Sequence, residues 1–267
     1  MPDPADESRL WVPKVHELRK EAVNAVIKHL GPIHVGLGQP SLEHNPAIIL
    51  RDSMLYRAES VGYHLDLLKW QFAAFTQRSQ SIVGSDGKPH LLGFRKVLTF
   101  LSDDILFNSI SMLDYVGNLV GCTLSGPNDQ RLKWNGVVKA ARDGTNPLAT
   151  KAAAKMMLTL HKEWIDGLHG ARSEIIHERI TLGDGGRAIT FPEGTHFLST
   201  LSFEMPPTVV KRLAFLVTFA DTKGRVQLVV GAEQIALRAI DVAKAVMTAL
   251  LEDLGGRLKA STSETGS

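Results

Sequence analysis

Long stretches of this chain carry apolar residues at steps of three and four positions, which is the period of an α-helix that buries one face. In the clearest stretch these positions include Leu106, Ile110, Leu113 and Val120. Glycine and proline pairs separate the stretches and set the expected helix ends. The expected helices cover residues 13–30, 53–77, 95–124, 147–182 and 233–254. The pattern therefore predicts a mainly α protein, a helical bundle with one shorter polar segment at 134–142.

The period changes before the last of these helices. Short segments rich in β-branched and aromatic residues lie at 189–191, 197–203, 213–220 and 226–230. Asp221 to Gly224 has the composition of a hairpin turn, with glycine where a left-handed residue is needed. We therefore expect a small antiparallel β insertion at about 187–230. The expected domains are an N-terminal extension with one helix (1–50), the bundle (51–258) and a disordered tail (259–267).

Composition narrows the functional classes. The 30 Lys and Arg residues against 28 Asp and Glu give a net charge of +2, so any RNA contact must be local, to a few phosphates. The single cysteine, Cys122, excludes an intrachain disulfide and a cysteine-based zinc site. No apolar run of about eighteen residues occurs and the start is acidic, so we expect a cytoplasmic protein without membrane contact. No metal and no other cofactor is expected, because His161 and His169 are two helical turns apart.

Near the end of the 147–182 segment stands Arg172-Ser173-Glu174-Ile175-Ile176-His177. RNA cleavage without metal needs proton transfer and stabilisation of charge on phosphate, because the 2′-OH is the nucleophile. A histidine titrates at about pH 6.5 and suits the first role, while the planar charged fork of arginine suits the second. His177 and Arg172 are therefore the candidate catalytic residues. Ser173, Glu174 and Glu178 are candidate supporting residues, or ordinary polar residues of a helix end.

Helix geometry limits how this pair can act. Positions five apart on a helix differ by about 140° in direction, so Arg172 and His177 do not share a face. A joint site requires side-chain reach, a distorted last turn or a second subunit. Gly167 and Gly170, shortly before the motif, predict a close helix contact or a bend. Gly117 and Gly121 predict the same close approach to the 95–124 helix.

The motif, late in a helix of a bundle that a β segment follows, resembles the HEPN (higher eukaryotes and prokaryotes nucleotide-binding) superfamily. The resemblance covers about residues 53–182 and the last helix. It implies a homodimer in which two motif helices face each other, with Arg172 and His177 of both subunits in one cleft. It further implies a metal-independent endoribonuclease of a bacterial toxin–antitoxin or phage-defence system. Asp114 and Asn118, a polar cluster on the 95–124 helix, would support this cleft or serve packing instead.

Other functions stay open at this point. Active members of the superfamily often carry Asn, Asp or His after the arginine, whereas this chain has Ser173. That difference favours a catalytically inactive HEPN-like binding or scaffold module, with an antitoxin or a nucleotidyltransferase as partner. A small-molecule pocket lined by Trp164 and Met156 is a third hypothesis, although such residues at helical spacing are more often core.

Overall fold

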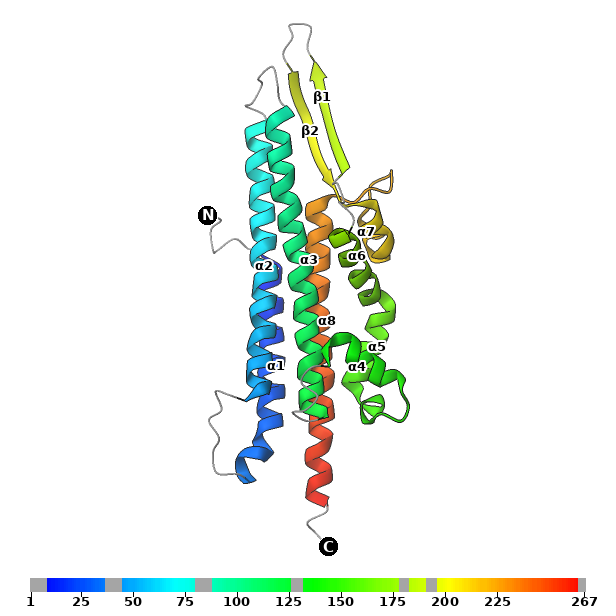
Figure 1. Ribbon diagram of the computed structural model, residues 1–267. Coiled ribbons are helices and arrows are strands. Elements are labelled where there is room, and N and C mark those ends of the chain that lie inside the picture. Colours follow the sequence, from blue (N-terminus) through cyan, green and yellow to red (C-terminus); the bar gives the residue numbers. More distant parts are fainter. Residues whose placement is uncertain are drawn as a thin grey trace. The chain divides into compact units, whose positions relative to one another are not determined.

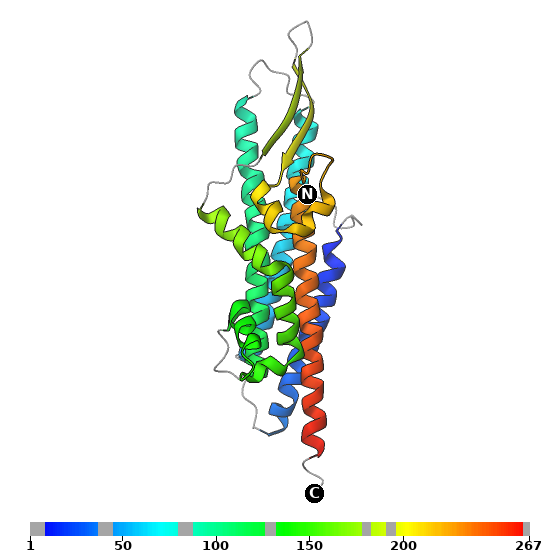
Figure 2. The same ribbon diagram turned by 90° about the vertical axis from the view of Figure 1, so that its right-hand side faces the viewer.

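The computed structural model describes residues 9–36, 45–79, 88–125, 132–177, 183–190 and 196–263. Its secondary structure is dominated by helices, which confirms the prediction of a mainly α helical bundle (Figure 1). The helices are α1 (Trp11–Gly36), α2 (Pro46–Ser79), α3 (Lys88–Leu124), α4 (Lys133–Arg142), α5 (Ala152–Leu160), α6 (Asp166–His177), α7 (Pro207–Arg212) and α8 (Leu228–Ser263). α8, orange to red in Figure 2, is one unbroken helix through Gly255 and Gly256, where the sequence had predicted its end.

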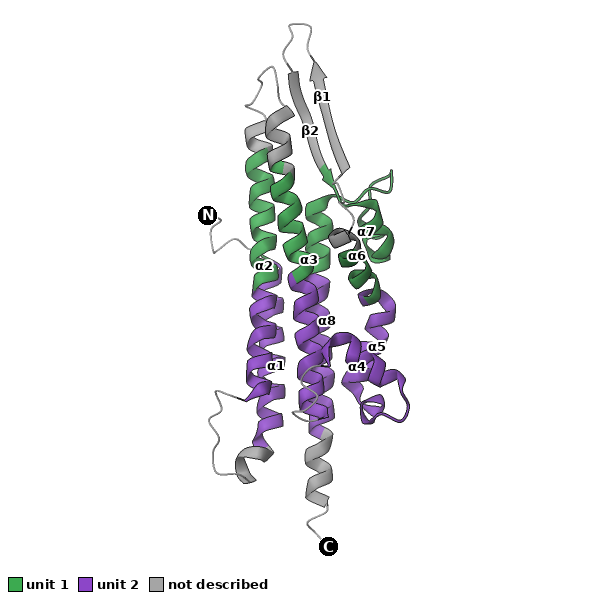
Figure 3. Ribbon diagram, viewed as in Figure 1, with its two compact units in different colours: residues 1–9, 60–107, 166–236 green, residues 10–59, 108–165, 237–267 purple. Residues whose placement is uncertain are grey.

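The chain divides into two compact units, each assembled from three stretches of sequence (Figure 3). Unit 1 contains residues 1–9, 60–107 and 166–236, and unit 2 contains residues 10–59, 108–165 and 237–267. The long helices α2, α3 and α8 contribute residues to both units. Neither unit is a continuous piece of chain, so neither boundary could be read from a local change in composition.

In unit 2, Arg19 of α1 pairs with Glu59 of α2, and two further ion pairs connect α1 with α8. The Lys14 ammonium lies 2.5 Å from Asp241 of α8, and Lys244 of α8 pairs with Glu17. The buried face of α1 lies between these contacts. The core of the unit includes Leu18, Val26, Met54, Leu113, Trp134, Met157, Ile240 and Val246. Apolar burial of this kind, at about 25 cal/mol per Å², provides most of the stability of a helical unit.

Glycine on α3 determines how α4 packs in unit 2. A Cβ atom at Gly117 would overlap the backbone of Lys133 and Trp134 at the start of α4. Glycine alone allows this approach, which buries the Trp134 side chain completely. The close contact predicted from Gly117 is confirmed.

In unit 1, aromatic side chains of α2, α3 and the second strand form a cluster. The rings of Phe75 and Phe94 stack at 3.8 Å between centroids. Phe203 lies edge-on or tilted against both, at 6.4 Å and 5.6 Å. Offset and edge-on pairs of this kind are the favourable geometries for aromatic rings. The cluster anchors the second strand to the α2–α3 pair.

The sheet is one antiparallel pair, β1 (Gly183–Thr190) and β2 (His196–Glu204). This confirms a small β insertion before the last helix, but only its first half is strand. The predicted strands at 213–220 and 226–230 are wrong, since Ala214–Phe219 is a 3₁₀ helix and α8 begins at Leu228. The turn at Asp221–Gly224 does form, with Gly224 at φ 74°, and it joins the 3₁₀ helix to α8.

The predicted 147–182 helix is broken into shorter pieces. Asn146 caps its first turn, because its side-chain oxygen accepts a hydrogen bond from the Leu148 N–H at 2.9 Å. That turn is a 3₁₀ helix, Pro147–Thr150, and Lys151 is extended. Asp253 of α8 then accepts hydrogen bonds from the N–H groups of Ala152 and Ala153, each at 2.9 Å, and so starts α5. The predicted end of the helix before Gly183 agrees with the structure, because Gly183 to Gly186 belong to β1. Residues 178–182 lie outside the described residues.

Among the described residues, one helical stretch, Lys96–Leu124, is long and apolar enough to cross a membrane. The protein itself buries 72% of the most apolar window in this stretch. Such burial is typical of the core helix of a soluble protein, and it agrees with the ridge of apolar side chains that α3 turns toward its neighbours.

Candidate active site

The motif helix α6 comes directly after a π-helical turn, His161–Ile165. A π turn inserts one extra residue into the helix and redirects the next turns, and such turns are frequent near functional sites. The turn lies before Arg172, so the helix is regular from Asp166 through His177. The helix between Arg172 and His177 is therefore not distorted in the described structure, and a distorted last turn does not bring these two residues together.

The glycines before the motif fit α6 closely against α7. A Cβ atom at Gly167 would overlap the carbonyl oxygen of Arg212, and one at Gly170 would lie 3.0 Å from the Arg212 side chain. A larger residue at Gly167 would push the two helices apart, whereas one at Gly170 would displace the Arg212 side chain. The prediction that Gly167 and Gly170 mark a close contact is confirmed, and the π turn supplies a helix irregularity as well.

Arg172 packs on the ring of Phe107 from α3. Its guanidinium carbon lies 5.2 Å from the ring centroid, within the range of a cation–π contact. The Arg172 Nε is buried and has no hydrogen-bond partner among the described residues. Nor does any carboxylate in the described part of the chain form an ion pair with this half-buried arginine. An aromatic ring thus holds the positive charge in place, and no acid of the described residues pairs with it.

For most of the other motif residues the structure describes the backbone but not the side chain. Ser173 is exposed beside Arg172. Glu174 and His177 belong to the backbone of α6, but their side chains lie outside the described residues, as does Glu178 altogether. Because α6 is regular, the helix positions of Arg172 and His177 differ by about 140°. Of the three ways to a joint site, side-chain reach and a second copy remain.

Asp114 and Asn118 have a structural role in unit 2. The Asn118 side-chain oxygen accepts a hydrogen bond from the Lys133 N–H at 2.8 Å, and Asp114 accepts one from the Trp134 N–H at 3.4 Å. The first N–H groups of a helix have no partner within it, so these two side chains cap α4 from the neighbouring helix. Arg172 belongs to unit 1. A supporting role of Asp114 and Asn118 in cleavage stays a prediction.

A carboxyl group that the sequence did not single out lies on α3, one helical turn before Phe107. Burial, with the neighbouring charge of Asp104 adding to it, raises the pKa of Asp103 to about 6. Asp104 itself lies 3.6 Å from the His64 ring, which donates a hydrogen bond to the Ser60 carbonyl at 2.7 Å. Two adjacent aspartates inside an apolar run were the signal available in the sequence. Asp103, with its pKa of about 6, therefore lies on α3, the helix whose Phe107 contacts Arg172.

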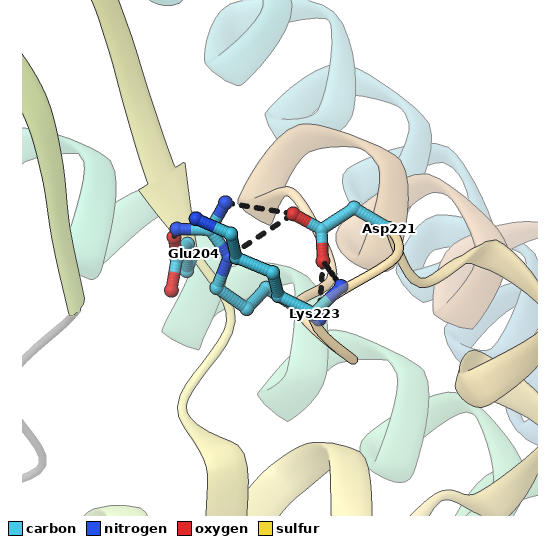
Figure 4. A network of polar contacts seen from close by, with 4 residues as sticks. Glu204, Asp221 and Lys223 are labelled. Atoms are coloured by element: carbon cyan, nitrogen blue, oxygen red, sulfur yellow. Dashed lines mark hydrogen bonds and ion pairs between the residues drawn. The ribbon is translucent and has the colours of Figure 1, made fainter.

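A second polar cluster in unit 1 stabilises a turn (Figure 4). Arg225 binds Glu204 at 2.8 Å and Asp221 at 2.8 Å and 3.0 Å, while Asp221 also accepts the N–H groups of Lys223 and Arg225. The hydrogen bonds from the Arg225 backbone and side chain lower the pKa of Asp221 to about 2. The carboxylate oxygens are satisfied by the chain itself, so this cluster holds the turn between the 3₁₀ helix and α8.

The remaining hypotheses concern ligands. Trp164 is buried under the Arg238 guanidinium, 5.4 Å from its ring, whereas Met156 is exposed. A small-molecule pocket lined by both side chains stays a prediction. Among the described residues, no three His, Cys, Asp or Glu side chains group in a way that would hold a metal ion.

Comparison of the chain with protein-family models, with curated proteins and with solved structures finds no match in any of the three. The resemblance to the HEPN superfamily therefore depends on the motif and its position in the bundle, and it stays a prediction.

Proposed function

We propose that this protein is a metal-independent endoribonuclease in which Arg172 binds the scissile phosphate and His177 transfers the proton. The observation that carries the proposal is the state of Arg172, a half-buried guanidinium held over Phe107 with no carboxylate partner in the described part of the chain. A charge in this state gains more from an incoming phosphate than one already paired with an acid. Ser173, exposed beside it, can donate a hydrogen bond to the same group.

The reaction balances without a metal ion. The 2′-oxygen attacks phosphorus, its proton passes to a neutral imidazole, and the 5′-oxygen leaves with a proton from a protonated imidazole. The products are a 2′,3′-cyclic phosphate and a 5′-hydroxyl. Arg172 stabilises the extra negative charge on the phosphorane oxygens in between. One His177 can serve as both base and acid, because the proton that it takes from the 2′-OH is the one that it gives to the 5′-oxygen.

A site shared by two copies agrees with the helix geometry. The helix positions of Arg172 and His177 differ by about 140° in direction on a regular helix, so an arginine of one copy and a histidine of a second copy can face the same phosphate. The working form is a homodimer. Its setting is the cytoplasm of a bacterium, as the toxin of a toxin–antitoxin pair or as part of phage defence, with an antitoxin as the controlling partner.

RNA cleavage in EDTA tests the activity. The wild type is incubated with single-stranded RNA beside Arg172→Ala and His177→Ala, and the new ends are examined for cyclic phosphate. Each substitution should lower the rate by about 100-fold or more, because each removes a charge or proton-transfer group. Arg142→Ala and His16→Ala, exposed residues of α4 and α1, are the matched controls and should cleave normally. Equal cleavage by all five proteins would assign the activity to a contaminant.

The Phe107 contact also favours a second candidate, a catalytically silent scaffold that binds another protein such as a nucleotidyltransferase. In that case Arg172 serves packing, as cation–π pairs often do. Arg172→Ala would then lower the melting temperature and leave no activity to lose. Conversely, an unchanged melting temperature with lost cleavage would exclude the scaffold function.

A further inference from the structure

The helix position of His177 belongs to a different face of α6 from that of Arg172. Each residue of a regular helix turns by about 100°, so Gly170 and His177, seven positions apart, differ by only about 20° in direction. Gly167 and Ser173 each lie about 60° from Gly170, whereas Arg172 lies about 160° away. Gly167, Gly170, Ser173 and His177 therefore mark one side of α6, which we call the histidine face.

Arg212 of α7, the helix beside α6 in Figure 1, lies along the histidine face. Its carbonyl oxygen lies so close to Gly167 that a Cβ atom there would overlap it. Its Cδ and Nη1 atoms each lie 3.0 Å from where a Cβ atom of Gly170 would be. The side chain thus advances by three residues of α6, about 4.5 Å along the helix axis. It advances in the direction of His177.

Glycine at position 170 makes room for the guanidinium of Arg212. At Gly167 the neighbouring atoms belong to the α7 backbone, so packing of the two helices alone accounts for that glycine. At Gly170 they belong instead to the far end of a flexible and exposed side chain. A glycine inside a helix costs about 1 kcal/mol relative to alanine. The fold therefore accepts this cost at Gly170 where the group accommodated is a charge.

The surroundings of this guanidinium suit a phosphate. The planar fork of arginine matches two phosphate oxygens, and an exposed one is open to a strand of nucleic acid. Ser173, the next position on the histidine face after Gly170, is short and exposed. Asp166, the acid on this face whose side chain is described, comes a full turn before Gly170. A phosphate bound on the Ser173 side of Arg212 is thus placed away from that carboxylate.

We propose that Arg212 binds a phosphate of single-stranded RNA next to the scissile one, on the same copy as the His177 that transfers the proton. The helix rises by about 10 Å from Gly170 to His177, which is more than one phosphate group spans. Arg172 lies on another face of α6, so in the shared site it comes from the second copy. The inference rests on the proposed nuclease function and adds a requirement for its substrate, a phosphate beyond the cleaved bond.

Fluorescence anisotropy with a 2′-O-methyl RNA tests the contact, because this strand keeps its phosphates but has no 2′-hydroxyl to react. Arg212→Gln should weaken binding by about tenfold, the loss expected for one charged hydrogen-bonded contact. It should also lower the salt dependence by about one phosphate contact. Gly170→Leu keeps every charge but fills the place of the guanidinium, and it should bind as weakly as Arg212→Gln.

A matched control separates this contact from a general effect of charge. Lys211→Gln removes the same charge from the exposed neighbour of Arg212 on α7, and it should bind within about twofold of the wild type. Melting curves check that each variant is folded. Wild-type protein that does not bind the strand, unchanged binding by Arg212→Gln, or an equal loss in Lys211→Gln would each overturn the inference.

Steady-state cleavage separates the inference from the proposed function. Arg212→Gln should raise KM about tenfold and leave kcat within about threefold, because a phosphate away from the cleaved bond is bound equally before and during the reaction. A wild type that binds the methylated strand through Arg212 but cleaves no RNA would refute the nuclease and keep the Arg212 contact. Cleavage that needs Arg172 and His177, with KM unchanged in Arg212→Gln, would refute the contact and keep the nuclease.

Discussion

Replacing Asp103 with asparagine should stabilise the protein at alkaline pH and leave it unchanged at acidic pH. The pKa of Asp103 is raised from about 3.8 to about 6, because burial disfavours its charged form and Asp104 adds a like charge. The folded state thus favours the protonated carboxyl. The stability that this group contributes is fully present below about pH 3.8 and is lost as pH rises through about 6.

The raised pKa also sets the size of the effect. The rise from 3.8 to about 6 corresponds to about 3 kcal/mol at about 1.4 kcal/mol per pKa unit. Asp103 is only partly buried, and solvent screening reduces this to about 1–2 kcal/mol. Asparagine stays neutral at every pH and has nearly the same shape. Asp103→Asn should therefore be more stable than the wild type by about 1–2 kcal/mol at about pH 8 and equal to it at about pH 3.

Urea unfolding of both proteins at the two pH values measures the difference from the midpoints. Glu252→Gln, at an exposed residue of α8, is the control and should change stability by less than about 0.5 kcal/mol at either pH. A gain of equal size at both pH values would show that shape rather than charge is responsible. No gain at about pH 8 would refute the reasoning from burial.

Further substitutions test packing and the site. Gly117→Ala should lower the free energy of unfolding by about 2 kcal/mol or more in urea unfolding, because its Cβ would overlap the α4 backbone. Gly31→Ala is the contrasting case, because no atom lies within 4 Å of its Cβ, and it should stabilise α1 by about 0.5–1 kcal/mol. Asp253→Ala should cost about 1–2 kcal/mol in the same assay, because two N–H groups of α5 lose their acceptor; an unchanged midpoint would mean that water replaces it. Phe107→Leu should keep the fold but lower the RNA cleavage rate about tenfold, since Arg172 loses the ring that positions it, and full activity would separate Phe107 from the site.

The long helices α1, α2, α3 and α8 were predictable because each has a buried face that repeats at helical period over several turns. The second half of the predicted β insertion was not, although its residues are β-branched and aromatic. Val209, Leu213 and Leu216 pack into the core of unit 1 as short helical turns, after proline at the first turn of α7 favours a helix start. Preference for strand is weak when the surrounding structure offers a helix-shaped place to bury the same side chains.

Some residues of the candidate site could likewise be predicted from the sequence, and others could not. Arg172 stands out in the sequence because its residue type and spacing carry chemistry. Phe107 does not, because its contact with Arg172 comes from packing between α3 and α6, which no local pattern encodes. The capping of α4 by Asp114 and Asn118 was predictable only in part. The glycine between them showed that something approaches α3 closely, but only the structure identifies the start of α4 as the approaching segment.

Mixing two inactive variants tests the shared site most directly. If an arginine of one copy works with a histidine of the other, an equal mixture of Arg172→Ala and His177→Ala forms mixed dimers, each with one complete site. After subunit exchange, the mixture should recover about a quarter of the wild-type RNA cleavage rate, since about half the dimers are mixed and each has one of two sites. Two inactive variants that remain inactive when mixed, under conditions where the copies demonstrably exchange, would contradict a site built from two copies.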